Sequence, residues 1–204
     1  MRSYLFAVLV GCLLVAGCVN VGKRAGEQNV AIYDFGKLPA ALVGDANRSM
    51  AYGLEIRSPR WLDSAAINYR LGYDKGSRRN EYTLSRWVAT PAQLIDHRLR
   101  YQLGLASPGQ SGVRCVLVVE IDEFLQLFTS TTESAGVLQG NVRLLDRSRN
   151  GLSSWRFDFD VPAVTPDASG GAAALIVAVD HLGKAIFNWM DTADGRAARS
   201  SCAN

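Results

Sequence analysis

The residue best placed for covalent chemistry is Cys18, because of the sequence that precedes it. Arg2 supplies a positive charge, and residues 4–15 are almost wholly apolar. Ala16 and Gly17 then place small side chains directly before the thiol. A basic start, an apolar core and small residues at a cleavage site make up a secretory signal. The apolar run is shorter than the roughly 20 residues that a membrane-spanning helix needs. The sequence therefore predicts export, with a cysteine at the cut.

This arrangement resembles the bacterial lipoprotein signal, in which residues 1–17 are removed and the thiol is acylated. Cysteines of this kind carry several acyl chains, and two or more chains hold a protein firmly to a membrane. The same resemblance implies the outer membrane, because retention in the inner membrane would favour an aspartate where this chain has Val19. The alternative is an ordinary secreted protein in which the cysteine falls at the cut by chance. We expect a lipid anchor at Cys18 on the outer membrane, with the protein facing the periplasm.

The remaining cysteines fit an oxidising compartment. Cys12 would leave with the signal, so Cys115 and Cys202 remain. Two leftover thiols in the periplasm can pair, and a bridge closing a loop of about 90 residues is worth roughly 4 kcal/mol in the chain-entropy model. In the alternative, Cys115 is buried on a strand and Cys202 lies free in a flexible tail. Both readings stay open. We expect no metal, because the cysteines and histidines have no ligand spacing.

The sequence contains no recognisable catalytic motif. His97 and His181 each follow an aspartate on an expected helix, where neighbouring side chains point in different directions, so neither forms a dyad. No nucleophile elbow, phosphate loop, zinc motif or dinucleotide fingerprint occurs. Asp158 and Asp160 alternate onto one strand face. They could form half of a carboxylate or calcium site, or simply the hydrated face of a sheet. We expect neither enzyme activity nor a cofactor.

Composition predicts one folded domain. The chain has 204 residues with a formal net charge of +3, which gives no basic excess to suggest nucleic acid. Without the signal it is long enough for a single domain with a substantial core. Residues 18–29 are polar and contain glycine, and they predict a tether that reaches at most about 35–40 Å. We expect the domain over 30–192 and a flexible tail over 193–204.

Two helices are expected from capping signals and apolar spacing. Thr90, Pro91 and Gln93 have the pattern of a capped start for a helix over 91–105. A second apolar stripe predicts a helix over 171–191. Period-two patterns and turn residues predict strands over 30–35, 49–57, 66–73, 81–87, 113–128, 134–146 and 152–161. The expected fold is α+β, with a mostly antiparallel or mixed sheet of six to seven strands and two packed helices.

Aromatic and basic residues concentrate around the hairpin expected over 66–87. They are Trp61, Tyr69, Arg70, Tyr82, Arg86 and Trp87. Tryptophan, tyrosine and arginine are common anchors of protein interfaces. Tyr69, Arg70, Arg86 and Trp87 are therefore candidate partner-binding residues, although the residue types alone favour the alternative that follows. In the alternative interpretation the aromatic residues pack in the core, while the arginines pair with acids or extend over apolar surface.

The same region resembles a known family. Residues 57–70 read Arg-Ser-Pro-Arg-Trp-Leu-Asp-Ser-Ala-Ala-Ile-Asn-Tyr-Arg, and after them come Tyr82, Arg86-Trp87, Pro91 and a helix that ends in Leu99 and Leu103. This order is similar to that of the ABC-type transport auxiliary lipoproteins, the PqiC-like lipoproteins found with MCE-family transport systems. There, a leucine–aspartate turn leads to an Ile-x-Tyr-Arg strand, an Arg-Trp strand end and a helix. The likeness covers about residues 30–192 and is sharpest over 55–103.

The resemblance implies a non-catalytic component of an envelope machine. An ABC permease and ATPase would work at the inner membrane, and an MCE protein would carry hydrophobic cargo, phospholipid above all, across the periplasm. This chain would dock or cap the machine at its outer-membrane end. If members of the family assemble as rings, it would be homo-oligomeric. The alternatives are another outer-membrane or secretion-system assembly lipoprotein, and a periplasmic lipoprotein hydrolase.

Overall fold

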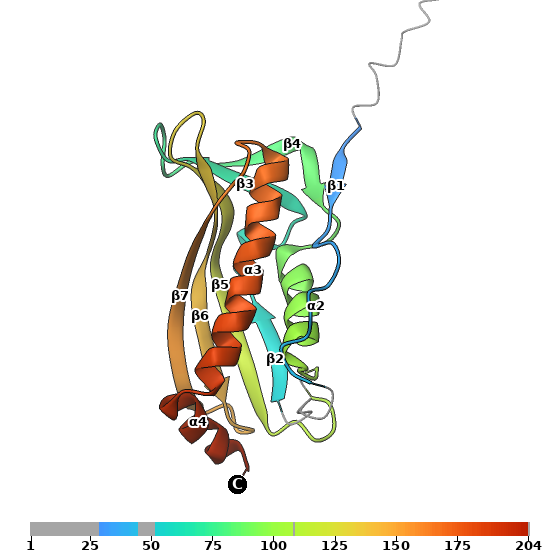
Figure 1. Cartoon of the computed structure of the whole chain (residues 1–204), viewed down its shortest axis with the longest axis vertical. Coiled ribbons are helices and arrows are strands. Elements are labelled where there is room, and N and C mark those ends of the chain that lie inside the picture. The colour runs from blue at the N-terminus through green and yellow to red at the C-terminus, as the bar shows by residue number, and fades with distance from the viewer. Residues whose placement is uncertain (1–28, 45–51, 108, 204) are drawn as a thin grey trace, which may run out of the picture.

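A curved sheet carries two long helices on one of its faces (Figure 1). The computed structural model describes residues 29–44, 52–107 and 109–203. The expected signal peptide, Cys18 and nearly all of the tether therefore lie outside the described residues. The strands are β1 (Ala31–Tyr33), β2 (Tyr52–Arg57), β3 (Ala66–Leu71), β4 (Arg79–Trp87), β5 (Cys115–Phe128), β6 (Ser134–Leu145) and β7 (Gly151–Pro162), and the helices are α2 (Pro91–Leu103), α3 (Ala168–Met190) and α4 (Ala193–Ala203).

The seven strands form one mixed sheet in the order β1-β4-β3-β5-β6-β7, with β2 also paired to β5. β5, β6 and β7 follow one another in the chain and pair antiparallel. β3 and β4 form the expected antiparallel hairpin. β2 and β3 both run parallel to β5, β2 beside its first half and β3 beside its end. The predicted α+β class with a mixed sheet is confirmed, and α4 adds a third helix.

β5 changes the set of residues that it buries halfway along its length. Its register against β6 shifts between Ile121 and Glu123, so Asp122 is an extra residue in the ladder. Such a bulge reverses the alternation of the side chains that follow it. Odd positions such as Ile121 reach the core before the bulge, and even positions such as Phe124 reach it afterwards. Acidic side chains thereby stay on the other face along the whole strand.

α2 begins where the sequence predicts it. The Thr90 side chain accepts a hydrogen bond from the Gln93 backbone N–H, and the Gln93 side chain accepts one from the Thr90 backbone N–H. This reciprocal pair is a complete capping box, with Pro91 at the first helical position. The helix ends at Leu103, two residues before the expected end, because Gly104 takes a left-handed φ of 63°.

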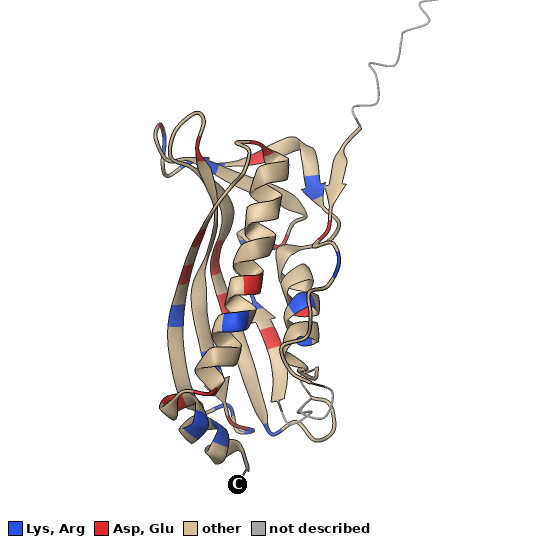
Figure 2. Ribbon diagram, in the orientation of Figure 1, with Lys and Arg blue, Asp and Glu red and all other residues tan. Residues whose placement is uncertain are grey.

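α3 begins at Ala168, three residues before the expected start. Asp167 caps it, because its Oδ1 accepts the Gly170 N–H at 2.8 Å. By length and composition alone α3 could cross a membrane. In this fold, however, α3 packs on the sheet through its apolar stripe, as the core helix of a domain does. Figure 2 shows few charged residues along α3. The stripe buries Leu175, Val179, Leu182 and Ile186.

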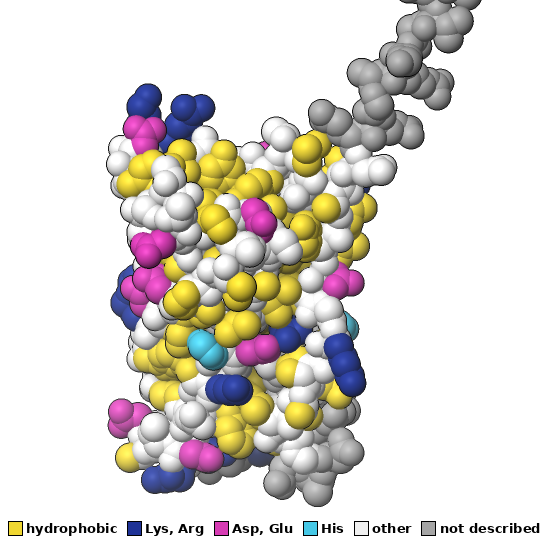
Figure 3. Space-filling view, turned by 45° about the horizontal axis from the view of Figure 1, so that its top comes forward, with side chains coloured by type: hydrophobic (Ala, Val, Ile, Leu, Met, Phe, Trp, Pro, Cys, Tyr) yellow, Lys and Arg dark blue, Asp and Glu magenta, His cyan; other side chains and the backbone are white. Residues whose placement is uncertain are grey.

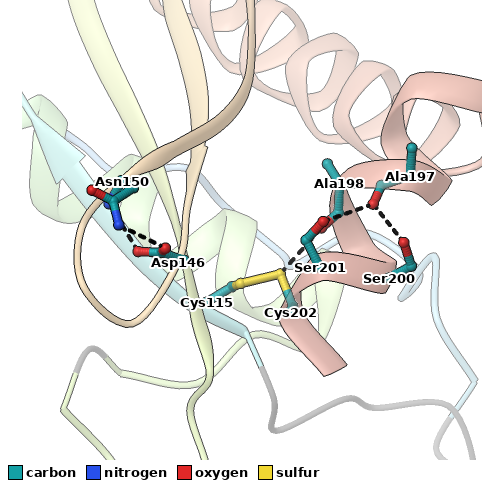
Figure 4. Close-up of a disulfide and its surroundings, with 8 residues drawn as sticks. All are labelled: Cys115, Asp146, Asn150, Ala197, Ala198, Ser200, Ser201 and Cys202. Atoms are coloured by element: carbon teal, nitrogen blue, oxygen red, sulfur yellow. Dashed lines mark hydrogen bonds between the residues drawn. A yellow bond between two sulfur atoms is a disulfide. The ribbon is translucent and has the colours of Figure 1, made fainter. Parts of the chain in front are cut away.

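The flexible tail expected over 193–204 is wrong for residues 193–203, which form α4. Thr192 caps this helix by accepting the Gly195 N–H with its hydroxyl at 3.1 Å. On α4, Cys202 is joined by a disulfide to Cys115, the first residue of β5, with the two Cα atoms 5.7 Å apart (Figure 4). Of the two readings that the sequence leaves open, the structure has the bridge. It ties α4 to the start of the central strand.

Candidate docking surface

The sheet divides the four hairpin residues assigned to partner binding between its two faces. Trp87 lies on the helix side with 1% of its surface exposed. Its ring packs edge-on against Phe35 at a centroid distance of 5.4 Å and lies 5.9 Å from the ring of Phe124. This corrects the assignment of Trp87 to a partner contact. It is a core residue, as the alternative interpretation has it, because no partner can reach a buried ring.

Tyr69 is half-buried on the same side and belongs to a packed cluster. Its ring centroid lies 4.6 Å from that of Tyr82 and 5.9 Å from that of Phe128. The Tyr82 hydroxyl donates to Gln126 Oε1 at 2.8 Å, and the Gln126 amide donates to the Ser134 hydroxyl at 2.7 Å. Burial raises the pKa of Tyr82, with the neighbouring Tyr69 ring adding to the effect. The cluster therefore holds the hairpin on the sheet with neutral groups and leaves little of Tyr69 for a partner.

Arg70 lies on the opposite side of the sheet, which we call the outer face because α2 and α3 cover the other one. Its Nη2 is 3.1 Å from Glu123 Oε1, and Arg79 Nη2 is 2.6 Å from Glu123 Oε2. One carboxylate of β5 therefore joins the two strands of the hairpin. Arg70 Nε is buried and has no hydrogen-bond partner among the described residues. The ion pair with Glu123 therefore holds the Arg70 guanidinium in place, while its Nε–H donor is unused.

The other carboxylates along the outer face of β5 are paired in the same way. Glu120 Oε1 accepts from Arg57 and from Arg143, each at 3.4 Å. Asp122 lies 3.5 Å from Arg156 of β7. Half-exposed ion pairs like these stabilise a fold by about 0–1 kcal/mol each. Their main effect here is to fix a pattern of alternating charge on the outer face of the sheet.

Trp61 is the exposed aromatic residue of this surface. It belongs to a short 3-10 turn over Arg60–Leu62 in the β2–β3 connection, and 60% of its surface is exposed. The buried side chain of Leu62 fixes the turn. Trp61 borders a shallow pocket of about 360 Å³ whose other walls include Arg57 and Asp122. An indole on a fixed turn beside paired charges has the composition of an interface anchor.

In the sequence, Trp61 lies near the hairpin residues, and no pattern there shows that its side chain is more exposed than theirs. Exposure cannot be read from a single tryptophan in a loop. The one local signal is its neighbour Pro59, which ends β2 and starts the turn. The structure thus moves the candidate surface from the hairpin itself to the outer face of β5. Arg70 lies on this surface, and Arg86 lies further away, on the β1–β4 edge of the sheet.

The residues that could have been catalytic are used for other purposes. Asp180 does not face His181: it accepts from Arg98 Nε at 2.7 Å, Arg98 Nη2 at 2.8 Å and the Gln102 amide at 2.7 Å. Asp158 accepts from the Gln139 amide at 3.0 Å. Among the residues that the structure describes, no three His, Cys, Asp or Glu side chains gather as a metal site would need.

Solved structures share the fold. A crystal structure of a Xanthomonas campestris protein, described with the family model DUF330, superposes with a TM-score of 0.64 at 16% sequence identity and covers 85% of this chain and 100% of its own. A second crystal structure, of an uncharacterized protein, has a TM-score of 0.62 at 13% identity and covers 79% of this chain and 98% of its own. No family model matches the sequence, and no curated protein matches it. At these identities the likeness establishes the fold alone.

Proposed function

We propose that this chain is an outer-membrane lipoprotein of the periplasm that serves as a non-catalytic docking subunit of an MCE/ABC-type lipid transport system. Cys18 is its acyl anchor, and the domain docks an MCE-type protein at the outer-membrane end, while the ABC permease and ATPase of the same system work at the inner membrane. The order of motifs over 55–103 supports this role.

The observation that carries the proposal is Trp61 on the outer face. Burying a large indole against a partner removes much apolar surface from water, and such residues dominate binding energy in many interfaces. The arginines and carboxylates around Trp61 form a polar rim. On binding, these side chains can replace their ion pairs within the domain by ion pairs with the partner. Trp61 is also held by backbone geometry, because the turn over Arg60–Leu62 is anchored by buried Leu62. Little ordering entropy is then lost on binding.

The test is crosslinked affinity purification of the full-length protein from native membranes, with the captured proteins identified by mass spectrometry. The wild-type chain should capture an MCE-type protein together with its permease. Trp61→Ala should weaken that capture by the equivalent of about 2 kcal/mol, roughly 30-fold in affinity. Arg70→Ala should weaken it to a smaller extent, because Arg79 still pairs with Glu123.

The matched control is Tyr101→Ala, which removes an exposed aromatic side chain from α2 on the helix side. It should leave capture unchanged. Equal capture by the Trp61 variant and wild type would move the docking surface elsewhere. Capture of outer-membrane or secretion-system assembly proteins in place of a transport system would refute the lipid-transport role and support the first alternative.

A further inference from the structure

The edge of the sheet at β1 and β4 carries apolar side chains that the fold leaves uncovered. Val30, Ile32, Leu84 and Val88 have exposed fractions of 43%, 57%, 44% and 60%. β1 pairs parallel with β4, with Ile32 opposite Arg86. Because alternate residues of a strand share a face, Val30 lies on the side of Ile32 and Val88 lies on the side of Arg86. Leu84 lies in the part of β4 where the register against β3 shifts. We call these four apolar residues with Arg86 the edge patch.

From the edge patch we propose that this end of the domain rests on the bilayer surface that holds the anchor of the same molecule. The inference rests on the acylation of Cys18 in the proposed function, and it does not depend on the transport partner. Its occupant is a phospholipid surface, because only residues 19–28 separate the described structure from the anchor proposed at Cys18.

The segment between β1 and the proposed anchor at Cys18 is short. β1 is the strand from which the chain runs toward its N-terminus (Figure 1), and residues 19–28 separate the described structure from Cys18. A chain of this length spans at most about 35–40 Å even when fully extended. The edge patch is therefore held close to the acyl chains. Tethering at this range raises the effective concentration of the two surfaces to the millimolar scale, so that a weak apolar contact is enough.

The edge patch combines a cationic side chain with exposed apolar side chains. Arg86 has no hydrogen bond or ion pair with the residues that the structure describes, and it lies among apolar neighbours. In a typical interfacial membrane contact, apolar side chains enter the boundary between headgroups and acyl chains, and a neighbouring cationic side chain binds a lipid phosphate. A water-facing surface gains nothing from this combination, whereas a phospholipid surface satisfies both parts of it.

The same end of the molecule offers further residues of this kind. The β3–β4 turn and the β7–α3 loop lie at the end where β1 does (Figure 1). The turn carries exposed Tyr73 and Lys75, and the loop carries Val164, which is almost fully exposed. Figure 3, in which this end comes forward, shows hydrophobic side chains gathered there. Tyrosine and lysine are residues that extend from an apolar contact to a polar headgroup.

The experiment uses the mature lipidated protein in vesicles of phosphatidylethanolamine and phosphatidylglycerol. The photoreactive residue p-benzoylphenylalanine replaces Ile32 or Val88, and in the control it replaces Val177, which is exposed on α3. After irradiation, mass spectrometry measures lipid adducts at each site and the acylation of the N-terminal peptide. We expect adducts at the two patch sites in at least tenfold excess over the control, and a severalfold loss at Ile32 when Arg86→Glu is added.

The outcomes separate the two proposals. Equal yields at patch and control sites in acylated protein would overturn the membrane contact and leave the proposed function standing. Adducts between Ile32 and the chain's own residues 19–28, or a second protein molecule, would overturn it as well, because the patch would then have another occupant. An N-terminal peptide without acyl chains would refute the anchor, and the membrane contact with it.

Discussion

Arg98 of α2 closes a bidentate ion pair with Asp180 of α3, with Nε 2.7 Å from Oδ1 and Nη2 2.8 Å from Oδ2. Arg98 Nη1 also donates to the Phe35 carbonyl at 2.8 Å. One buried guanidinium therefore joins both core helices and the segment after β1. Planar two-point pairing of this kind is among the stronger hydrogen-bonded arrangements in proteins.

Asp180→Ala should be strongly destabilising, because it leaves the buried Arg98 charge without its partner. We expect the free energy of unfolding to fall by about 3 kcal/mol, measured by urea denaturation of the full chain. Asp191→Ala is the matched control, since the Asp191 side chain is exposed and forms a long ion pair of 3.4 Å with Arg199. A change of less than about 0.5 kcal/mol in the Asp180 variant would contradict the role given to this pair.

Reduction of the Cys115–Cys202 disulfide should loosen α4. The bridge spans a sequence separation of 87 residues, so its loss should lower the free energy of unfolding by about 4 kcal/mol in the chain-entropy model. Limited trypsin digestion checks the local effect, because Arg196 and Arg199 lie on α4. Cleavage there should accelerate on reduction. Two free thiols in exported, non-reduced protein would contradict the bridge.

Trp87→Ala should act on stability. Truncation of a fully buried tryptophan costs about 3–5 kcal/mol, which is a large part of the stability of a typical domain. Trp61→Ala removes the same side chain from an exposed position and should leave the melting temperature nearly unchanged. The comparison of the two melting curves is the measurement. A stable Trp87 variant would place its ring outside the core.

Acid should weaken the start of α3. The Gly170 N–H and the Thr165 hydroxyl stabilise the charged form of Asp167 and lower its pKa from the ordinary value of 3.8. A lowered pKa contributes stability that is complete above the unfolded-state value and is lost as the pH falls through the folded-state value. Asp167→Ala should therefore cost about 1 kcal/mol at pH 7.

The same substitution should cost less as the pH drops below about 3.8, because the wild-type cap is then being protonated as well. Denaturation curves at pH 7 and at pH 3 measure the difference. Asp160→Ala, on the exposed face of β7, is the control and should have little effect at either pH. A cost that is independent of pH would mean that the carboxylate charge is not what caps the helix.

Local signals in the sequence predicted much of the fold. Thr90 and Gln93 marked the start of α2 because a capping box depends on residues three positions apart. The β3–β4 hairpin was predictable for the same reason, since its alternation and its turn are both local. The cap at Thr192 was also local, but the small polar residues after it hid the helix. Alanine and arginine are in fact good helix formers.

The rest depends on contacts that are distant in the chain. The parallel pairing of β2 and β3 with β5 has no sequence signal, and neither does the choice between paired and free Cys202. The bulge at Asp122 reversed the burial pattern of β5. The adjacent acids Asp122 and Glu123 interrupt the apolar residues there, but period-two reasoning alone does not show which side chains face the core on each side of them. Because the sequence does not locate the bulge, it could not show that Arg70 and Trp61 share a face of the sheet with the carboxylates of β5.

The pairing of β5 on both of its edges has a consequence for the order of folding. On one edge it meets β6 through a short turn, and on the other it meets β2 at residues 63 positions away, as Arg57 and Glu120 do. Closing long loops is slow because their entropy is lost before any contact forms. We expect the β5–β6–β7 meander to gain amide protection first in pulse-labelled hydrogen exchange. Until β2 and β3 arrive, an exported chain presents a long apolar strand edge, which makes the interval before their docking the period of greatest aggregation risk.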